Sequence, residues 1–256
     1  MKPLLLLALA LSISPLVHAA DPACRSLVMT GHPSYPPVAW ASGGKIIGAA
    51  PTMVTDIVRT LGVTKITSKD FGTWEKAQEA ARKGDVDIIF GIYRNTERET
   101  YLNYVEPPFM VDPVAVAVRT GTEFPFAEWT DLKGKKGVTN VGESYGTKFD
   151  AFMAKELTVA REKGVDKSFK ALVNKKADFM IVGLYPGKQV ARGLGIRAKV
   201  EFLPKEITAA DMYVAFSKKS KCYDSLQAGL SAGIKTDVER GTVAELLQTA
   251  SRAVVK

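Results

Sequence analysis

Hydrophobic residues along this chain switch between two periods, which predicts strands alternating with helices. The apolar run 86–92 follows acidic residues and fits a strand buried on both faces, as in a parallel sheet. Segment 51–61 has helical spacing, with its apolar residues on one stripe and Gly62 as a stop signal. Helix-like segments 74–83 and 169–176 each lead into a further apolar strand. The pattern therefore predicts an α/β protein.

Two of these strands end alike, about ninety residues apart. One ends Gly91-Ile92-Tyr93 and the other Gly183-Leu184-Tyr185, each after a helix and an aspartate. This similarity indicates two lobes of like construction that face each other.

The first strand end carries the clearest candidate chemistry. Thr96-Glu97-Arg98-Glu99 has the spacing of a capping box and predicts a short helix after Tyr93. Ligands of open α/β sheets bind beyond the carboxyl ends of the strands. Arg98 therefore brings a planar, five-donor fork, which matches a carboxylate, to the place where a small molecule would bind.

The remaining segments predict how the chain crosses between the lobes. The alternating strand 114–118 takes the chain into the second lobe and strand 211–216 brings it back, so the hinge has two strands and lobe one is discontinuous. Further expected elements are strands 25–31, 63–71 and 137–141 and C-terminal helices that begin at Tyr223 and Asp237.

The N-terminus predicts export. Residues 1–19 have a basic start at Lys2, a short apolar core and a small-residue cleavage site, as in a secretory signal peptide, so the mature chain begins at Ala20. The apolar core is too short to span a bilayer, and no later stretch approaches about 18 apolar residues. Asp21-Pro22-Ala23 before Cys24 is a poor match to a lipobox. We expect a soluble protein of the periplasm.

Charge narrows the function further. Loss of Lys2 takes the net charge from +8 to +7 over the remaining 237 residues. No basic stretch is interleaved with aromatics as in a nucleic-acid-binding module, so the expected role of the charge is steering of anionic solutes or association with anionic surfaces.

Cys24 and Cys222 are the only two cysteines. Either a disulfide joins them or they are two separately buried thiols; an even count in an exported chain favours the disulfide. His32 is the only histidine left after signal cleavage, so neither a metal site nor a cofactor is expected.

Gly142-Glu143-Ser144-Tyr145-Gly146 matches the nucleophile elbow G-x-S-x-G between a strand and a helix. Hydrolysis by that motif needs a downstream histidine, and no histidine follows His32. The remaining interpretation is a turn whose backbone N–H groups and helix dipole hold an anion.

The stretch GDVDIIFGIYRNTER…VEPPF resembles the polar amino-acid-binding family of bacterial extracellular solute-binding proteins. Tyr35-Pro36-Pro37, Trp74 thirteen residues before Asp87, the segment 131–135 (DLKGK) and the strand that begins at Ala177-Asp178 add to this resemblance. It implies a two-lobed periplasmic-binding-protein fold of type II, with mixed, mostly parallel sheets joined by a two-strand hinge. Lobe one would comprise residues 20–110 and 210–256, and lobe two residues 111–209.

The resemblance also implies roles for single residues. Arg98 would bind the ligand's carboxylate, although an arginine in a first helical turn is usually solvated. Trp74 would stack on the ligand or, alternatively, pack its helix onto the sheet. Tyr35 would lie along the ligand or pack within its own loop. The full expected ligand-binding set is Tyr35, Trp74, Tyr93, Arg98, Ser144 and Tyr145.

One position departs from the family. Gly183 stands where members that bind α-amino acids usually place an acid for the ammonium group, and the loop from Asp87 to Arg98 is one residue shorter. A buried, unpaired ammonium is costly, which favours a net-anionic or amine-free ligand. Glu143 is the obvious substitute acid, if it faces the cleft.

The expected function is that of the periplasmic receptor of an ABC importer, a monomer that binds a small carboxylate-bearing solute by hinge closure and delivers it to an inner-membrane permease. A cyclohexadienyl dehydratase-like enzyme, with Glu143 or Glu97 as its acid, is one alternative. A periplasmic sensor without a role in transport is the other.

Overall fold

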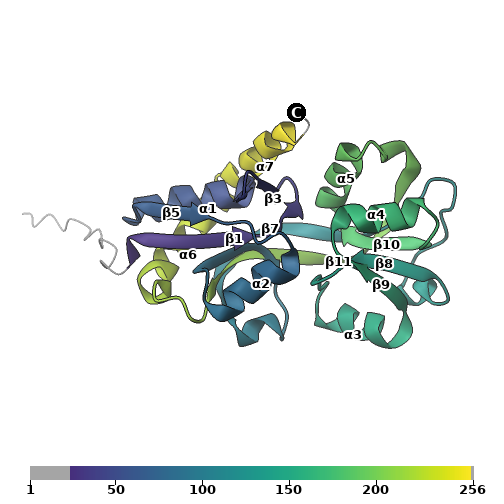
Figure 1. Cartoon of the computed structure of the whole chain (residues 1–256), viewed down its shortest axis with the longest axis horizontal. Coiled ribbons are helices and arrows are strands. Elements are labelled where there is room, and N and C mark those ends of the chain that lie inside the picture. Colours follow the sequence, from purple (N-terminus) through teal and green to yellow (C-terminus); the bar gives the residue numbers. More distant parts are fainter. Residues whose placement is uncertain (1–23, 255–256) are drawn as a thin grey trace, which may run out of the picture.

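The structure is a computed structural model that describes residues 24–254, and it has two lobes (Figure 1). The predicted signal peptide and the start at Ala20 lie outside the described residues. Two long strands, β7 (Leu102–Arg119) and β11 (Val200–Ser217), run through both lobes and join them.

Within residues 24–254, one mixed eight-stranded sheet extends across the molecule in the order β5-β1-β6-β11-β7-β10-β8-β9. The strands β1, β5 and β6 are parallel in lobe one, β8 is parallel to β9 and β10 in lobe two, and β7 and β11 run antiparallel to their neighbours. The bounds are β1 Ser26–Gly31, β5 Lys65–Ser68, β6 Ile88–Tyr93, β8 Lys136–Asn140, β9 Thr158–Glu162 and β10 Phe179–Gly183. A small antiparallel sheet adds β2 Ser34–Tyr35, β3 Ala39–Ser42 and β4 Lys45–Ile47.

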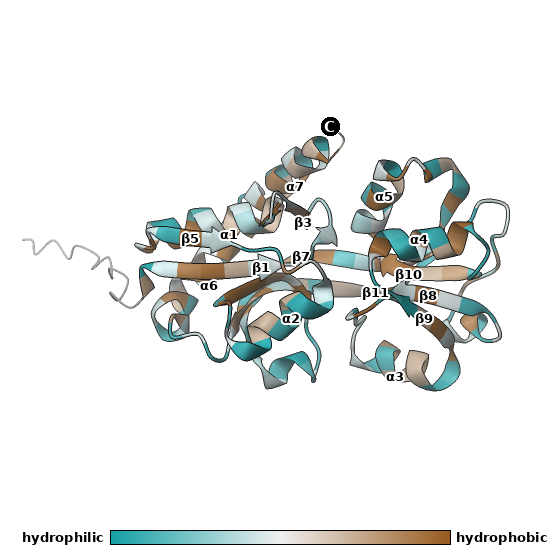
Figure 2. Cartoon of the chain, viewed as in Figure 1, coloured by the Kyte–Doolittle hydropathy of each residue, from teal (hydrophilic) through white to brown (hydrophobic). Residues whose placement is uncertain are grey.

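Helices cover the faces of the sheet in each lobe (Figure 1), and the apolar residues gather on the strands between them (Figure 2). Lobe one carries α1 Ala49–Thr60, α2 Trp74–Lys83, α6 Tyr223–Glu239 and α7 Thr242–Ala253. Lobe two carries α3 Thr147–Glu156, α4 Val165–Val173 and α5 Leu184–Gly193. Single 3₁₀ turns are η2 Arg98–Thr100, η3 Trp129–Leu132 and η4 Arg197–Lys199. The α/β class and the two-strand hinge are confirmed.

The hinge strands pair in register where they cross between the lobes. Val111 lies opposite Asp211 and Asp112 opposite Ala210. The predicted lobe boundaries, 110/111 and 209/210, fall at this paired segment. An acid at Asp112 interrupts an otherwise apolar stretch of β7, and this acid becomes important at the site.

Three predicted helix boundaries are wrong, each for a local reason. The helix α1 begins at Ala49, two residues before Pro51, because the chain turns at Gly48, which has a φ of 130°. The predicted capping box does not form; instead, the Asn95 side chain accepts the backbone N–H of Arg98 at 2.7 Å, and only a 3₁₀ turn follows. The helix α6 continues past Asp237 to Glu239, and α7 starts only after Gly241, whose φ is 78°.

The two cysteines lie close together in the fold. Both are buried, and the Cys24 thiol lies 3.6 Å from the carbonyl oxygen of Lys221, the residue before Cys222. The structure does not test their pairing, so the disulfide stays a prediction for the oxidised protein.

Candidate ligand-binding site

Arg98 lies at the bottom of the cleft between the lobes, in the turn that follows β6. Its side chain is buried, only 2% exposed, and all three guanidinium nitrogens are engaged. Nε donates to Gln78 Oε1 at 3.0 Å, Nη1 to the Tyr93 carbonyl at 2.9 Å and Nη2 to the Gly142 carbonyl at 3.0 Å. The guanidinium carbon also lies 5.7 Å from the centre of the Trp74 ring. These acceptors are all neutral, so the buried charge has no carboxylate bonded to it and remains available to an anion.

Further contacts hold the two lobes together around Arg98. The Gly142 carbonyl of lobe two also accepts the Gln78 amide at 3.0 Å, and Asn95 Nδ2 donates to Ser144 Oγ at 2.6 Å. A side chain at Gly142 would press on Gln78 and on the backbone of Glu75, and the φ of Gly142 is 83°, so this close approach needs glycine. The turn that follows β8 therefore meets lobe one through its backbone.

A histidine–glutamate pair crosses the cleft beside Arg98. The Glu143 carboxylate lies 3.0 Å from His32 Nε2, and both side chains are buried. The backbone N–H of Ser34 donates to His32 Nδ1 at 2.9 Å, which places the imidazole proton on Nε2, where it is donated to Glu143. The imidazole lies between two rings, 5.1 Å from Tyr35 and 5.0 Å from Trp74, measured between ring centres.

The pKa of Glu143 is lowered despite its burial. Burial alone raises the pKa, but the hydrogen bond from His32 and the electrostatic interactions with His32 and the Arg98 guanidinium favour the ionised form and outweigh it. Glu143 is thus a carboxylate held inside the cleft, rather than a solvated group.

A second buried acid lies at the hinge. Asp112 Oδ2 accepts the Tyr35 hydroxyl at 2.7 Å and the Tyr93 hydroxyl at 2.8 Å, and the two hydroxyl oxygens are 2.6 Å apart. Burial raises the pKa of Asp112 to about 6, although the tyrosine hydrogen bonds act in the opposite direction. Burial also raises the pKa of both tyrosines well above the usual value, so they stay protonated.

The Asp112 group fills the space beside Gly183. A Cβ at Gly183 would overlap the Tyr35 hydroxyl and Asp112 Oδ2. A carboxyl group from the hinge strand therefore lies directly beside position 183.

The Ser144–Tyr145 turn is occupied by an internal anion. The Asp150 carboxylate of α3 accepts the Ser144 hydroxyl and the backbone N–H of Tyr145, the latter at 2.8 Å. The Tyr145 hydroxyl donates to the Ile181 carbonyl at 2.9 Å, within lobe two. The structure thus brings Tyr35, Trp74, Tyr93, Arg98 and Ser144 together around the cleft and directs the Tyr145 hydroxyl into lobe two.

Two hollows open onto this site. One, of about 730 Å³, includes Arg98, Gly142, Glu143 and Ser144 among its lining residues. The other, of about 380 Å³, lies near the hinge and includes Tyr93, Asn95 and Tyr145. Arg98 can therefore be reached by a small solute from the first hollow.

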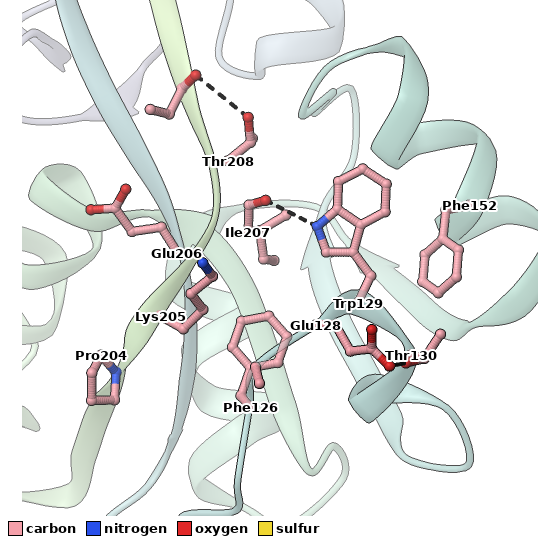
Figure 3. A pocket seen from close by; sticks show the side chains of 12 residues that line it. Phe126, Glu128, Trp129, Thr130, Phe152, Pro204, Lys205, Glu206, Ile207 and Thr208 are labelled. Carbon is pink, nitrogen blue, oxygen red and sulfur yellow. Dashed lines mark hydrogen bonds between the residues drawn. The ribbon is translucent and has the colours of Figure 1, made fainter.

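A third hollow lies on lobe two, away from the cleft (Figure 3). It measures about 740 Å³ and has Phe126, Trp129 and Phe152 in its wall. The Trp129 indole N–H donates to the Ile207 carbonyl of β11 at 3.0 Å, so this ring covers a strand edge. Its position indicates a packing role.

Within residues 24–254, no cluster of three or more histidine, cysteine, aspartate or glutamate side chains could hold a metal ion. No helix in this part of the chain is long and apolar enough to cross a membrane.

Sequence analysis missed several residues of the site: Gln78, Asn95 and Asp112, together with the pairing of His32 and Glu143. The sequence did indicate a special role for Asp112, because a lone acidic residue in an apolar strand needs a hydrogen-bonding or charged partner. The pairing of His32 with Glu143 had no such signal, since the two residues lie 111 positions apart and meet only when the lobes close.

Comparison with known proteins gives a consistent result. The sequence profile of the bacterial extracellular solute-binding proteins, family 3, matches residues 27–250. No curated protein sequence matches the chain.

Among solved structures, a histidine kinase sensor domain with similarity to periplasmic binding proteins has a TM-score of 0.73 at 20% identity, covering 90% of this chain and 97% of that one. The substrate-binding protein of an amino acid ABC transporter has a TM-score of 0.66 at 23% identity, covering 88% and 98%. An amino acid ABC transporter substrate-binding protein from Streptococcus pneumoniae, bound to L-arginine, has a TM-score of 0.70 at 18% identity, covering 90% and 96%. These likenesses show the fold and confirm the periplasmic-binding-protein architecture.

Proposed function

The chain belongs to the bacterial extracellular solute-binding proteins of family 3, and from this premise we propose that it is the periplasmic receptor of an ABC importer for a small solute that bears a carboxylate. On this proposal residues 1–19 are cleaved on export, and the mature monomer delivers its ligand to an inner-membrane permease. The family typically comprises binding proteins rather than enzymes.

The observation that supports the proposal is the environment of the Arg98 guanidinium. Its guanidinium is buried between the lobes, contacts neutral acceptors from both of them and lines a hollow open to solvent. A ligand carboxylate would bond directly to the guanidinium and would take the place of the Gly142 carbonyl at Nη2. Binding at this point couples to hinge closure, because only the closed state brings both lobes to the ligand.

Asp112 changes the expected ligand range. The absence of an acid at Gly183 favoured an amine-free ligand, but a carboxyl group with a pKa near 6 lies beside that position. We propose that the site can bind carboxylate ligands both with and without an amine. Where the ligand has an amine, Asp112 faces it.

A thermal-shift screen of amino acids, dicarboxylates and aromatic acids tests the proposal. A ligand present at about 100 times its Kd should add ~2.7 kcal/mol of stability. The Arg98→Ala variant should lose that shift. Failure of every carboxylate to shift wild type, or an undiminished shift in the variant, would contradict the proposal.

A sensor that binds the same class of solute is the second candidate. The likeness to a histidine kinase sensor domain, which covers 97% of that domain, favours it specifically. Deleting the gene and measuring uptake of the ligand found in the screen distinguishes the two, since a sensor's loss leaves uptake by the transporter intact.

The enzyme alternative has no such support. Glu143 has a lowered pKa and pairs with His32, and Glu97 is exposed and paired with Arg82 at 2.5 Å. A general acid must hold its proton near the working pH, and the lowered pKa of Glu143 opposes this.

A further inference from the structure

A groove of about 490 Å³ separates α7 of lobe one from α5 of lobe two. It shares no lining residue with the Arg98 hollow. The side chains that α7 contributes are Ala244, Leu247, Gln248 and Ser251, and those from α5 are Tyr185, Lys188, Gln189 and Arg192. Each set follows the spacing i, i+3, i+4, i+7, which is one face of a helix, so two helix faces from different lobes oppose each other (Figure 1).

The floor of this groove is apolar and partly exposed. Val38 and the hinge residues Met110 and Val111 line it beside Leu247. Val111 is 51% exposed and Tyr185 is 47% exposed, and they are two of the four large hydrophobic residues that are exposed within the described chain. Apolar side chains gathered at one concave place indicate a surface that something covers.

The α5 wall supplies positive charge without compensation. Lys188 and Arg192 lie one helical turn apart and are exposed, and no acidic residue lines the groove. Between them Gln189 Oε1 is buried without a hydrogen-bond partner. The groove therefore presents an apolar floor, a cationic edge and one acceptor in need of a donor.

We propose that this groove binds a small amphipathic anion, an aromatic or branched aliphatic acid that also carries a hydrogen-bond donor such as a hydroxyl or amide. Its apolar body lies on Met110, Val111 and Leu247, its anionic group pairs with Lys188 and Arg192, and its donor meets Gln189. The volume lies within the range of small-molecule sites, roughly 300–1,000 Å³.

The position of the groove links it to hinge motion. Its two helical walls belong to different lobes, so an occupant that contacts both walls favours the arrangement of the lobes seen in this structure. By linkage, its binding and that of a cleft ligand that favours the same arrangement strengthen each other.

Titration with the fluorescent probe anilinonaphthalenesulfonate, an aromatic sulfonate with an amine N–H, tests the site on the full mature chain. We expect saturable binding to wild type with one site, displaced by 4-hydroxyphenylpropionate but not by the cationic 4-hydroxyphenylpropylamine. In the double variant Lys188→Glu/Arg192→Glu, affinity should fall about tenfold or more, because attraction becomes repulsion. Val111→Asp should weaken binding as well.

The matched control is Lys167→Glu/Lys176→Glu, which makes the same charge change at exposed residues of lobe two outside the groove. It should keep nearly the affinity of wild type. No saturable binding to wild type, unchanged affinity in the groove variants, or an equal loss in the control overturns the proposal.

Discussion

Two carboxyl groups are buried in the same cleft, and their pKa values move in opposite directions. Glu143 belongs to the Arg98 end, where a histidine N–H and a guanidinium lower its pKa. Asp112 belongs to the hinge end, where burial raises its pKa to about 6 and its partners are two tyrosine hydroxyls. Burial penalises both charges, so the difference comes from the partners.

The difference shows how the cleft is polarised. The Arg98 end stabilises negative charge and already holds one internal carboxylate, whereas the hinge end disfavours it. We therefore expect a ligand carboxylate at the Arg98 end, in competition with Glu143 and the Gly142 carbonyl. An uncharged or amine-bearing part of the ligand suits the end at Asp112.

Removing the cation should have the largest effect. Arg98→Ala should weaken binding of a carboxylate found in the screen by ~2–5 kcal/mol, about thirty-fold or more, because a charge-assisted pair in a buried site is lost. Isothermal titration calorimetry measures this. Arg59→Ala is the matched control, since Arg59 is an exposed residue of α1 that lines neither hollow of the site. Equal losses in the two variants would refute the polarised cleft.

Asp112→Asn should change how the free energy of unfolding depends on pH. A carboxyl whose pKa rises from 3.8 unfolded to about 6 folded destabilises the fold progressively as pH increases from about 4 to 6. The penalty above that window is about 3 kcal/mol, taking 1.36 kcal/mol per pKa unit. The variant lacks this penalty, so its stability relative to wild type should increase between pH 4 and pH 7.5 in urea unfolding experiments. A difference independent of pH would show that Asp112 titrates normally.

Gly183→Ala should strain the hinge end. Its methyl group would overlap the Tyr35 hydroxyl and Asp112 Oδ2, which should cost ~1–3 kcal/mol of unfolding free energy. Gly193→Ala, at the end of α5 with open space around it, should change stability little. Adding Tyr35→Phe to Gly183→Ala should recover part of the loss. Equal effects at the two glycines would mean that position 183 has room for a side chain.

Glu143→Gln should have the smallest effect, with the opposite pH dependence. A lowered pKa means that ionised Glu143 stabilises the fold above its unfolded value of about 4.5, and that this contribution disappears as pH falls through the folded value. Glutamine still accepts the His32 proton, so the loss at pH 7 should be about 1 kcal/mol. Chemical unfolding at pH 7 and pH 3 should show that the difference in unfolding free energy between wild type and variant becomes smaller in acid. A gap that widens in acid would contradict the assignment.

The sequence predicted the Arg98 end better than the hinge end. Arg98 and Trp74 follow from local signals, namely a buried strand that ends before a turn and an aromatic at a helix start. Asp112 and His32 depend on partners brought together by tertiary structure, and neither partner is adjacent in sequence. Competition between neighbouring side chains for the same backbone N–H group explains a smaller error. Asn95, and not Thr96, caps the turn at Arg98.

A crystal structure of the mature protein with a carboxylate from the screen tests the central claim most directly. The account predicts that the ligand's carboxylate is bonded to the Arg98 guanidinium, with the Gly142 carbonyl displaced from Nη2. A ligand bound elsewhere, with Arg98 still donating to Gly142, would contradict it.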